Sequence, residues 1–229
     1  MIVFNLTHEA ADVLPVTLSS NLAYLPTMNW YAHHVLINQS QCIIAMEERT
    51  RYAMVFCGMT EETLKQFPDI FAERLWREVF SICNHVDEAA MNTLMGRVKS
   101  LRHQVCFQRG FDKSVLSHIH QVAVDLREQV EVRKRALPVE PIAAFSYGIV
   151  RVNKVLRQRT ATKEYFVPID EFESLCMNLV KLPRSRTEPV VGIEPDEPAF
   201  ASEKTIELEL RPIEDAVAGN VIRVNFERR

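Results

Sequence analysis

The chain has 229 residues, of which 47% are hydrophobic and 25% are charged, and its formal net charge is −3. These values are ordinary for a globular protein, and no apolar run reaches the roughly 18 residues that span a bilayer. The N-terminus lacks the basic lead and the long apolar segment of a secretory signal, so we expect a cytoplasmic protein.

Residues 1–15, MIVFNLTHEAADVLP, predict a strand followed by a short helix. Thr7 belongs to the residue types that cap helix N-termini, because its hydroxyl accepts a hydrogen bond from the first turn. Pro15 cannot continue a helix, so we expect the helix to end before it.

Three short strands joined by two tight polar turns are predicted within residues 29–58. The strands cover residues 30–38, 41–47 and 51–57, which are rich in β-branched and aromatic residues. Connections this short force neighbouring strands to be antiparallel. Both sets of alternating side chains on the middle strand are largely apolar, so we expect both faces of the sheet to be covered.

Apolar residues at helical spacing predict a series of helices after this meander. Thr60 is the expected cap of the first, and Pro68 allows a restart at a first-turn position. Asp112 or Ser114 is the expected cap of the longest amphipathic helix. Residues 105–108 are predicted as a further strand. The predicted helices cover residues 60–82, 87–102, 112–130, 142–158 and 169–180.

We therefore predict an α+β fold in which an N-terminal antiparallel β-meander sheet is packed by amphipathic helices. Residues 1–181 form the predicted globular domain. Residues 182–203 are rich in proline and have neither helical nor strand periodicity, which indicates a linker. Residues 204–229 contain two alternating segments, TIELEL and VIRVNF, which predict a C-terminal β-hairpin-like tail.

The cysteines and histidines do not have the spacing of a metal site. His33 and His34 are neighbours on a strand and point to opposite faces, while His118 and His120 diverge by about 200° around a helix. No CxxC motif occurs, so we expect buried, reduced thiols, with a metal or redox role as the alternative. No metal or cofactor is predicted. The cysteines are Cys42, Cys57, Cys83, Cys106 and Cys176.

Glu47 and Glu48 are the only candidates for catalysis that the sequence offers. A strand followed by a turn with carboxylates and a second strand is similar to the ribonuclease H and integrase pattern, in which acidic residues hold two divalent ions. His33 or His34 stands where that pattern needs an acidic residue on the first strand, so the carboxylate set is incomplete. The other interpretation is a charged turn that keeps a hairpin soluble.

The charge of the chain is distributed unevenly. Residues 97–163 contain 14 Lys and Arg against 5 Asp and Glu, a net charge of +9, whereas the rest of the chain carries −12. Such a segment predicts an anionic partner, either nucleic acid or an acidic protein. The alternative is that acidic parts of the same chain neutralise it, or that it is a solvated face. The candidate binding residues are Arg151, Lys154, Arg157, Arg159 and Lys163.

Three segments of the chain resemble a widespread family of uncharacterised bacterial proteins described as a domain of unknown function. They are MIVFNLTHEAADVL, the block NWYAHHVLINQSQCIIAMEERTRYAMVF, and Asp112-Lys113-Ser114-Val115-Leu116. Where similar proteins carry an SVLGSMND-like run, this chain has Ser117-His118-Ile119-His120-Gln121. The resemblance covers mainly residues 1–130, provides no catalytic residues, and implies a bacterial protein associated with a plasmid or another mobile element.

The absence of a Gly-rich phosphate loop and of a GxSxG motif favours a non-enzymatic protein. The leading hypothesis is a binding protein that uses the basic helical surface of residues 97–163. The alternatives are an active or degenerate metal-dependent nucleic-acid enzyme that uses Glu47 and Glu48, and an adaptor or antitoxin-like protein whose tail covers a partner. The sequence predicts no membrane association and does not choose an oligomeric state.

Overall fold

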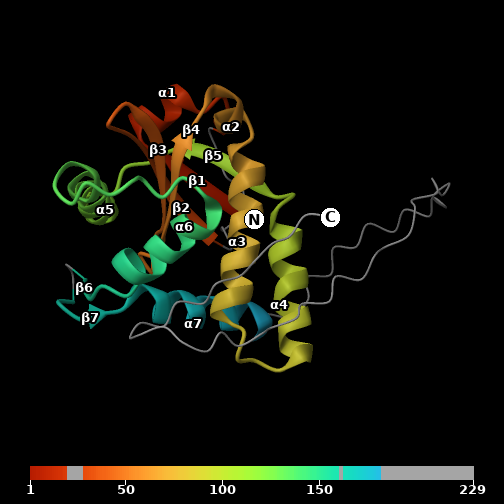
Figure 1. The fold of residues 1–229 in the computed structure, drawn as a ribbon. Coiled ribbons are helices and arrows are strands. Elements are labelled where there is room, and N and C mark those ends of the chain that lie inside the picture. The colour runs from red at the N-terminus through yellow and green to blue at the C-terminus, as the bar shows by residue number, and fades with distance from the viewer. Residues whose placement is uncertain (20–27, 160–161, 182–229) are drawn as a thin grey trace, which may run out of the picture. The chain divides into compact units, whose positions relative to one another are not determined.

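The computed structural model describes residues 1–19, 28–159 and 162–181, and the structural statements below refer to these residues. A five-stranded sheet forms the central layer, and helices lie against both of its faces (Figure 1). The strands of this sheet are β1 (Ile2–Leu6), β2 (Met28–Ile37), β3 (Ser40–Glu47), β4 (Ala53–Met59) and β5 (Val105–Arg109). The helices are α1 (His8–Val13), α2 (Glu61–Lys65), α3 (Phe67–Ile82), α4 (Glu88–Leu101), α5 (Lys113–Glu131), α6 (Pro141–Tyr147) and α7 (Pro168–Lys181).

The strand order across the sheet is β4-β3-β2-β1-β5. The strands β2, β3 and β4 form the antiparallel meander that the short turns predict. β1 is parallel to both of its neighbours, β2 and β5. The predicted α+β class is confirmed, but the sheet is mixed rather than antiparallel, because β1 pairs in parallel with β2 and with the edge strand β5, which comes from a distant part of the sequence.

Each face of the sheet has its own apolar core, as the two apolar faces of the middle strand predict. The first core lies between the sheet and α1, α3, α4 and α7, and it contains Ile43 and the aromatic residues Trp30 and Phe71, whose ring centroids are 4.9 Å apart. The second core lies between the sheet and α5 and α6, where Ile44 and Ile119 are fully buried. The chain is therefore built in three layers.

The helix starts follow the capping residues found in the sequence. The Thr7 hydroxyl accepts a hydrogen bond from the backbone of Ala10, and Thr60 forms a capping box with Thr63. Asp112 caps α5, so of the two predicted caps for that helix the first is correct. These starts are local features, which explains why the sequence alone locates them.

The predicted single helix over residues 142–158 is correct only as far as Asn153, and its last part is wrong. The chain instead forms α6, then a π-helical turn η1 (Gly148–Asn153), and then a small hairpin of β6 (Arg157–Gln158) with β7 (Tyr165–Phe166). The wider turn places Asn153 inside the protein, where its side chain bonds the backbone of Ala53. A contact between distant segments therefore overrides the helical periodicity of the sequence.

The predicted linker, residues 182–203, and the predicted tail, residues 204–229, lie outside the described residues. The division into domains and the tail hairpin therefore stay predictions. All five cysteines are free thiols, and four of them are buried, as expected. Among the described residues no helix is both long enough and apolar enough to cross a membrane.

Candidate functional site

The most promising site lies where the parallel strands β1 and β5 end side by side. From Leu6 the chain continues into α1, which packs in the first core, and from Arg109 it continues towards α5, which packs in the second core. The chain thus leaves two adjacent parallel strands towards opposite faces of the sheet. In α/β sheets such a switch point opens a crevice at the carboxyl ends of the strands, where ligands bind.

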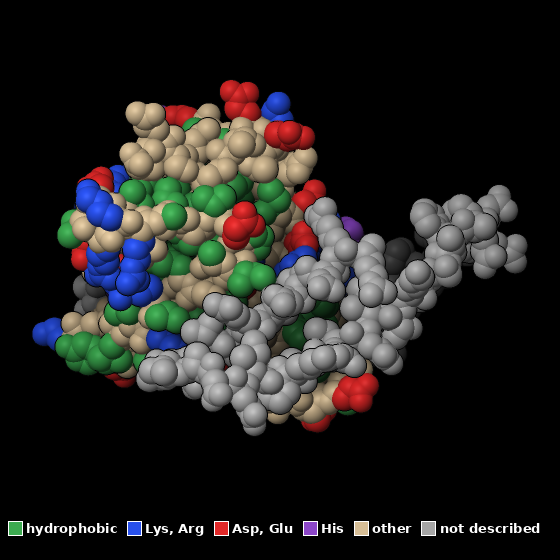
Figure 2. Space-filling model, viewed as in Figure 1, with side chains coloured by type: hydrophobic (Ala, Val, Ile, Leu, Met, Phe, Trp, Pro, Cys, Tyr) green, Lys and Arg blue, Asp and Glu red, His purple; other side chains and the backbone are tan. Residues whose placement is uncertain are grey.

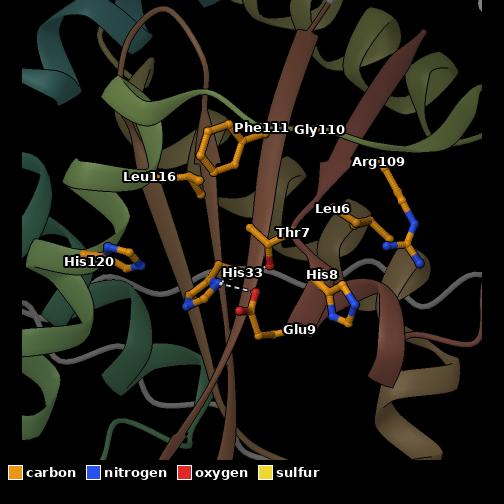
Figure 3. Close-up of a pocket in the computed structure, with 10 residues that line it drawn as sticks. All are labelled: Leu6, Thr7, His8, Glu9, His33, Arg109, Gly110, Phe111, Leu116 and His120. Atoms are coloured by element: carbon orange, nitrogen blue, oxygen red, sulfur yellow. Dashed lines mark hydrogen bonds and ion pairs between the residues drawn. The ribbon is translucent and has the colours of Figure 1, made fainter.

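A pocket of about 460 Å³ occupies this position. Figure 3 shows Thr7, Glu9 and His33 together at its centre, with Phe111 and Leu116 on one side and Arg109 on the other. Its lining comes from the ends of β1 and β5, from β2, from the start of α1, from the β5–α5 connection and from the first half of α5. The lining residues are Leu6, Thr7, His8, Glu9, His33, Arg109, Gly110, Phe111, Leu116 and His120.

His33 is the best-positioned polar group of the pocket. Its Nδ1 atom lies 3.1 Å from the Thr7 hydroxyl and 3.6 Å from a carboxylate oxygen of Glu9. The His120 ring from α5 packs edge-on against it, with the ring centroids 5.4 Å apart. These contacts hold the ring of His33 between the start of α1 and the side of α5.

The surroundings keep His33 neutral. Burial lowers the pKa of His33, Glu9 opposes that shift, and the neighbouring His120 adds to it. The pKa of Glu9 is lowered by its backbone N–H at the start of α1, so Glu9 is ionised at neutral pH. A neutral His33 that donates its Nδ1 proton to Thr7 or Glu9 presents a lone pair on Nε2, which can accept a hydrogen bond or a proton.

Gly110 allows β5 to leave the sheet tightly beside β1. Its backbone N–H donates to the carbonyl of Leu6 at 3.2 Å, and a Cβ atom at this position would lie 2.2 Å from the Cβ of Asn5. Asn5 is itself held between Gln108 and Asn29 by side-chain hydrogen bonds of 2.7 and 2.6 Å. These side chains link β5, β1 and β2 next to the strand ends that line the pocket.

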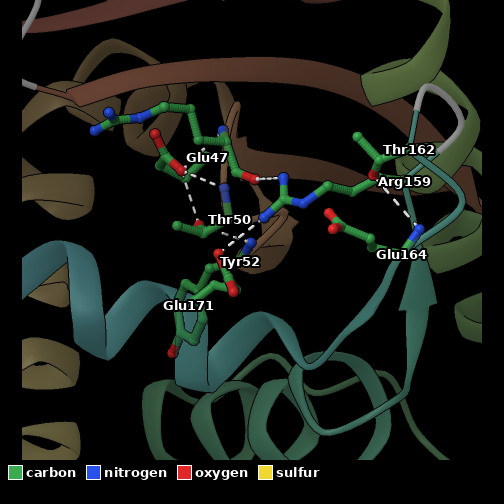
Figure 4. Close-up of polar contacts among 8 residues, drawn as sticks. Glu47, Thr50, Tyr52, Arg159, Thr162, Glu164 and Glu171 are labelled. Carbon is green, nitrogen blue, oxygen red and sulfur yellow. Dashed lines mark hydrogen bonds and ion pairs between the residues drawn. The ribbon is translucent and has the colours of Figure 1, made fainter.

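Glu47 and Glu48, the catalytic candidates of the sequence, are placed at the turn between β3 and β4. Glu47 is fully buried, and its carboxylate accepts hydrogen bonds from the backbone of Arg49 and from the backbone and hydroxyl of Thr50 (Figure 4). Glu48 accepts a hydrogen bond of 2.6 Å from Asn29. In this part of the chain Glu47 shapes the turn, and the described residues contain no group of three or more potential metal ligands.

Three of the five candidate binding residues form contacts within the chain. Arg151 pairs with Asp125 at 3.3 Å, and Arg157 is buried beside His118. Arg159 pairs with Glu171 at 2.8 Å and donates to the carbonyl of Arg49, as Figure 4 shows.

Lys154 and Lys163, the other two candidate binding residues, are exposed. Two of the five are therefore directly accessible to a partner. Lys and Arg side chains gather on one face over the region of α5 (Figure 2).

Sequence reasoning considered His33 and His120 separately and did not bring them together, and it gave no role to Glu9, Arg109 or Phe111. It did predict that the rings of His118 and His120 diverge, and the structure places His118 in the interior and His120 in the pocket. The available signal was the polar residues at the ends of these strands, Thr7, His8 and Glu9 after β1 and Arg109 as the last residue of β5. They could be recognised only if the two strands were known to be parallel neighbours.

Comparison with known proteins gives one family. The model of DUF6933, a domain of unknown function, matches residues 3–171, whereas no curated protein and no solved structure matches the chain. The match includes every residue that lines the pocket, and it confirms the resemblance drawn from residues 1–130. The chain therefore belongs to the DUF6933 family of domains of unknown function.

Proposed function

We propose that the protein binds a small organic acid that carries a hydroxyl or amine group, in the pocket between β1 and β5. The observation that carries this proposal is the convergence of His33, Glu9 and Arg109 on a cavity at a switch point of the sheet. Pockets of this size, with a few convergent polar groups and a titratable group of shifted pKa, are the usual ligand sites of proteins.

The lining indicates the chemistry of the ligand. Arg109 can pair with a carboxylate, and the lone pair on Nε2 of His33 can accept a hydrogen bond from a hydroxyl or an amine. Phe111, whose side chain is largely exposed at 73%, and Leu116 provide apolar contact for the body of the ligand. The carboxylate of Glu9 lies 3.6 Å from Nδ1 of His33, and within the described residues it forms no ion pair with Arg109, so the guanidinium of Arg109 is available to a ligand.

The test is an NMR titration of the imidazole signals of His33 and His120 with a panel of hydroxy acids and amino acids, with simple amines as the reference. We expect saturable shifts with the acids alone, and about tenfold weaker binding in Arg109→Gln, because a charge-assisted hydrogen bond is lost. Arg102→Gln is the matched control, since Arg102 is exposed and pairs with Asp69 outside the pocket. Equal binding to Arg109→Gln would disprove the proposed role of Arg109.

A second candidate function is binding of an anionic macromolecule, nucleic acid or an acidic protein, by the basic surface of residues 97–163. The exposure of Lys154 and Lys163, together with the exposed Lys134 and Arg135 after α5, favours it. Fluorescence anisotropy with labelled DNA and RNA across a salt series tests it, because the slope of affinity against salt counts the phosphates contacted. Lys154→Glu with Lys163→Glu should abolish binding, and Lys65→Glu should not.

The two remaining hypotheses have less support. A metal-dependent nuclease would need Glu47 as a ligand, but that carboxylate is buried in the turn. An adaptor or antitoxin-like role depends on the tail, which lies outside the described residues. It predicts a co-purifying protein that is lost on truncation after Leu182.

A further inference from the structure

Arg157 is a buried cation without a counter-charge. Its side chain is only 6% exposed, and its Nη1 atom lies 3.1 Å from Nδ1 of His118 and 3.4 Å from the amide oxygen of Gln121. Both neighbours are neutral, and across the described part of the chain Arg157 forms no ion pair. Its Nε atom is buried and has no hydrogen-bond partner.

The contrast with Arg74 shows that this is unusual within the same molecule. Arg74 is buried to the same degree, at 7% exposure, and it pairs with the carboxylate of Glu78. Buried charges in proteins are normally paired in this way, because an unpaired charge loses its hydration without compensation. Arg157 has donor capacity that the chain itself does not use.

A second cation lies one helical turn away. Arg51, at the end of the β3–β4 turn, donates from Nη2 to the hydroxyl of Ser114 at 3.1 Å. Ser114 and His118 are four residues apart on α5, so they lie on the same face of the helix on successive turns. The guanidinium groups of Arg51 and Arg157 therefore lie against adjacent turns of α5. Consistent with this proximity, Arg51 contributes to lowering the pKa of Arg157, after burial.

Three carboxylates act on Arg51 by their charge, those of Asp112, Glu48 and Glu47, and each accepts hydrogen bonds from other groups. Asp112 caps α5 by accepting from the backbone of Ser114 and Val115, at 2.8 and 3.0 Å, and Glu48 accepts from Asn29. These acids partly offset the lowering of the pKa of Arg51 by burial, whereas the pKa of Arg157 is lowered both by burial and by the charge of Arg51. Because Asp112 has already satisfied the first backbone N–H groups of α5, any ligand here must be bound by side chains.

We propose that Arg51 and Arg157 bind the oxyanion of a phosphate group, either free phosphate or a phosphomonoester, with the Ser114 hydroxyl as a further donor. Two guanidinium groups match the geometry of a tetrahedral oxyanion with several donors each, and arginine is the residue best suited to this recognition. The anion would give Arg157 the counter-charge that the described part of the chain does not provide, and it would reduce the repulsion between Arg157 and Arg51. This site is separate from the pocket between β1 and β5 and does not depend on the function proposed for it.

Isothermal titration calorimetry with inorganic phosphate tests the proposal, with chloride at equal ionic strength as the reference. We expect saturable binding at one site, weakened about tenfold or more in Arg51→Gln and in Arg157→Gln, because each removes charge-assisted hydrogen bonds. Arg133→Gln is the matched control, because Arg133 lies beyond the other end of α5 and pairs with Glu128. Unchanged binding should also be seen in His33→Gln, which separates this site from the pocket.

A second measurement keeps the test decisive if Arg157→Gln does not fold. In the wild-type protein, phosphate should raise the pKa of His118 followed by NMR, because an anion beside Arg157 favours the imidazolium form. Glycerol phosphate in place of inorganic phosphate distinguishes the sources, since tighter binding of the ester identifies a phosphomonoester and tighter binding of phosphate identifies the free ion. The proposal is overturned if neither compound binds saturably, or if Arg51→Gln binds as the wild type does.

Discussion

Asn153 forms with Ala53 both of the hydrogen bonds that a neighbouring strand would provide. The side-chain carbonyl of Asn153 accepts from the Ala53 N–H at 2.8 Å, and its amide donates to the Ala53 carbonyl at 2.9 Å. Ala53 begins β4, which is the last strand of the sheet on that side and has no further strand to pair with. The side chain of Asn153, at the end of the π-helical turn η1, thus satisfies both backbone groups of the first residue of an edge strand.

Asn153→Ala should therefore destabilise the protein by about 2–4 kcal/mol, because a buried donor and a buried acceptor of the backbone lose their partners together. Urea denaturation measures the effect as a lower midpoint at an unchanged slope. Asn92→Ala, an exposed substitution in α4, is the control and should have little effect. A loss of less than about 1 kcal/mol in Asn153→Ala would contradict the importance of this pair.

Glu47→Ala should cost about 2–4 kcal/mol of stability, because the backbone N–H groups of Arg49 and Thr50 and the Thr50 hydroxyl lose their acceptor. Glu48→Ala should cost about 1 kcal/mol, since it removes one hydrogen bond, to Asn29, from a partly exposed site. Thermal and urea unfolding of both variants measure the difference. A folded Glu47→Gln protein that loses a magnesium-dependent cleavage activity of the wild type would instead support the nuclease hypothesis.

Gly110→Ala and Gly96→Ala should have opposite effects. A methyl group at Gly110 would lie 2.2 Å from the Cβ of Asn5, so the start of α5 or β1 must shift and the pocket must deform. At Gly96, in the middle of α4, no atom lies within 4 Å of the new Cβ, so alanine should stabilise the helix by about 0.5–1 kcal/mol. Urea denaturation measures whether each substitution lowers or raises the free energy of unfolding. Stabilisation by Gly110→Ala would show that the close approach to Asn5 is not rigid.

The stability of the protein should fall as the pH falls from about 6.5 to about 4. Burial, and then the charges of Arg157 and Arg51, lower the pKa of His118 to about 4, whereas its ordinary value is 6.5. The unfolded chain therefore takes up the proton first, and the contribution of neutral His118, about 3 kcal/mol at most, is present above pH 6.5 and lost towards pH 4.

Urea denaturation at several pH values measures this loss in the wild type. His118→Asn should show a flatter pH dependence over this window, because asparagine can still accept a hydrogen bond from Arg157 but does not titrate. His85→Asn, at an exposed site, should follow the wild type. An identical pH profile for His118→Asn and the wild type would show that another group titrates in this window.

The sequence predicts the local part of this structure well. Thr7, Thr60 and Asp87 begin helices because their side chains cap the first turn, a contact that spans three residues and needs no tertiary information. The meander follows in the same way from its two short turns. The predicted helix over residues 142–158 ends early, at Asn153, where a contact with Ala53, a hundred residues away in the sequence, replaces its regular continuation.

The candidate sites depend on non-local pairing, so the sequence alone could not assemble them. Glu9 follows β1, His33 lies on β2, and Arg109 is the last residue of β5. These three residues meet only because β1 lies between β2 and β5 in the sheet. Similarly, Arg157 was recognised as a basic residue, but its burial beside His118 follows from the β6–β7 hairpin rather than from a helix face. Net charge along the chain does not show which cations are exposed.

The position of β1 also constrains the order in which the chain can fold. This strand is made before both of its neighbours, and its outer neighbour β5 is complete only when Val105–Arg109 has been made. Until β5 is made, one edge of the apolar strand β1 stays unpaired, whereas the meander can already form from contiguous residues. We therefore expect slow folding that completes late, as for other proteins dominated by long-range strand pairs, and a requirement for protection of the nascent N-terminal half.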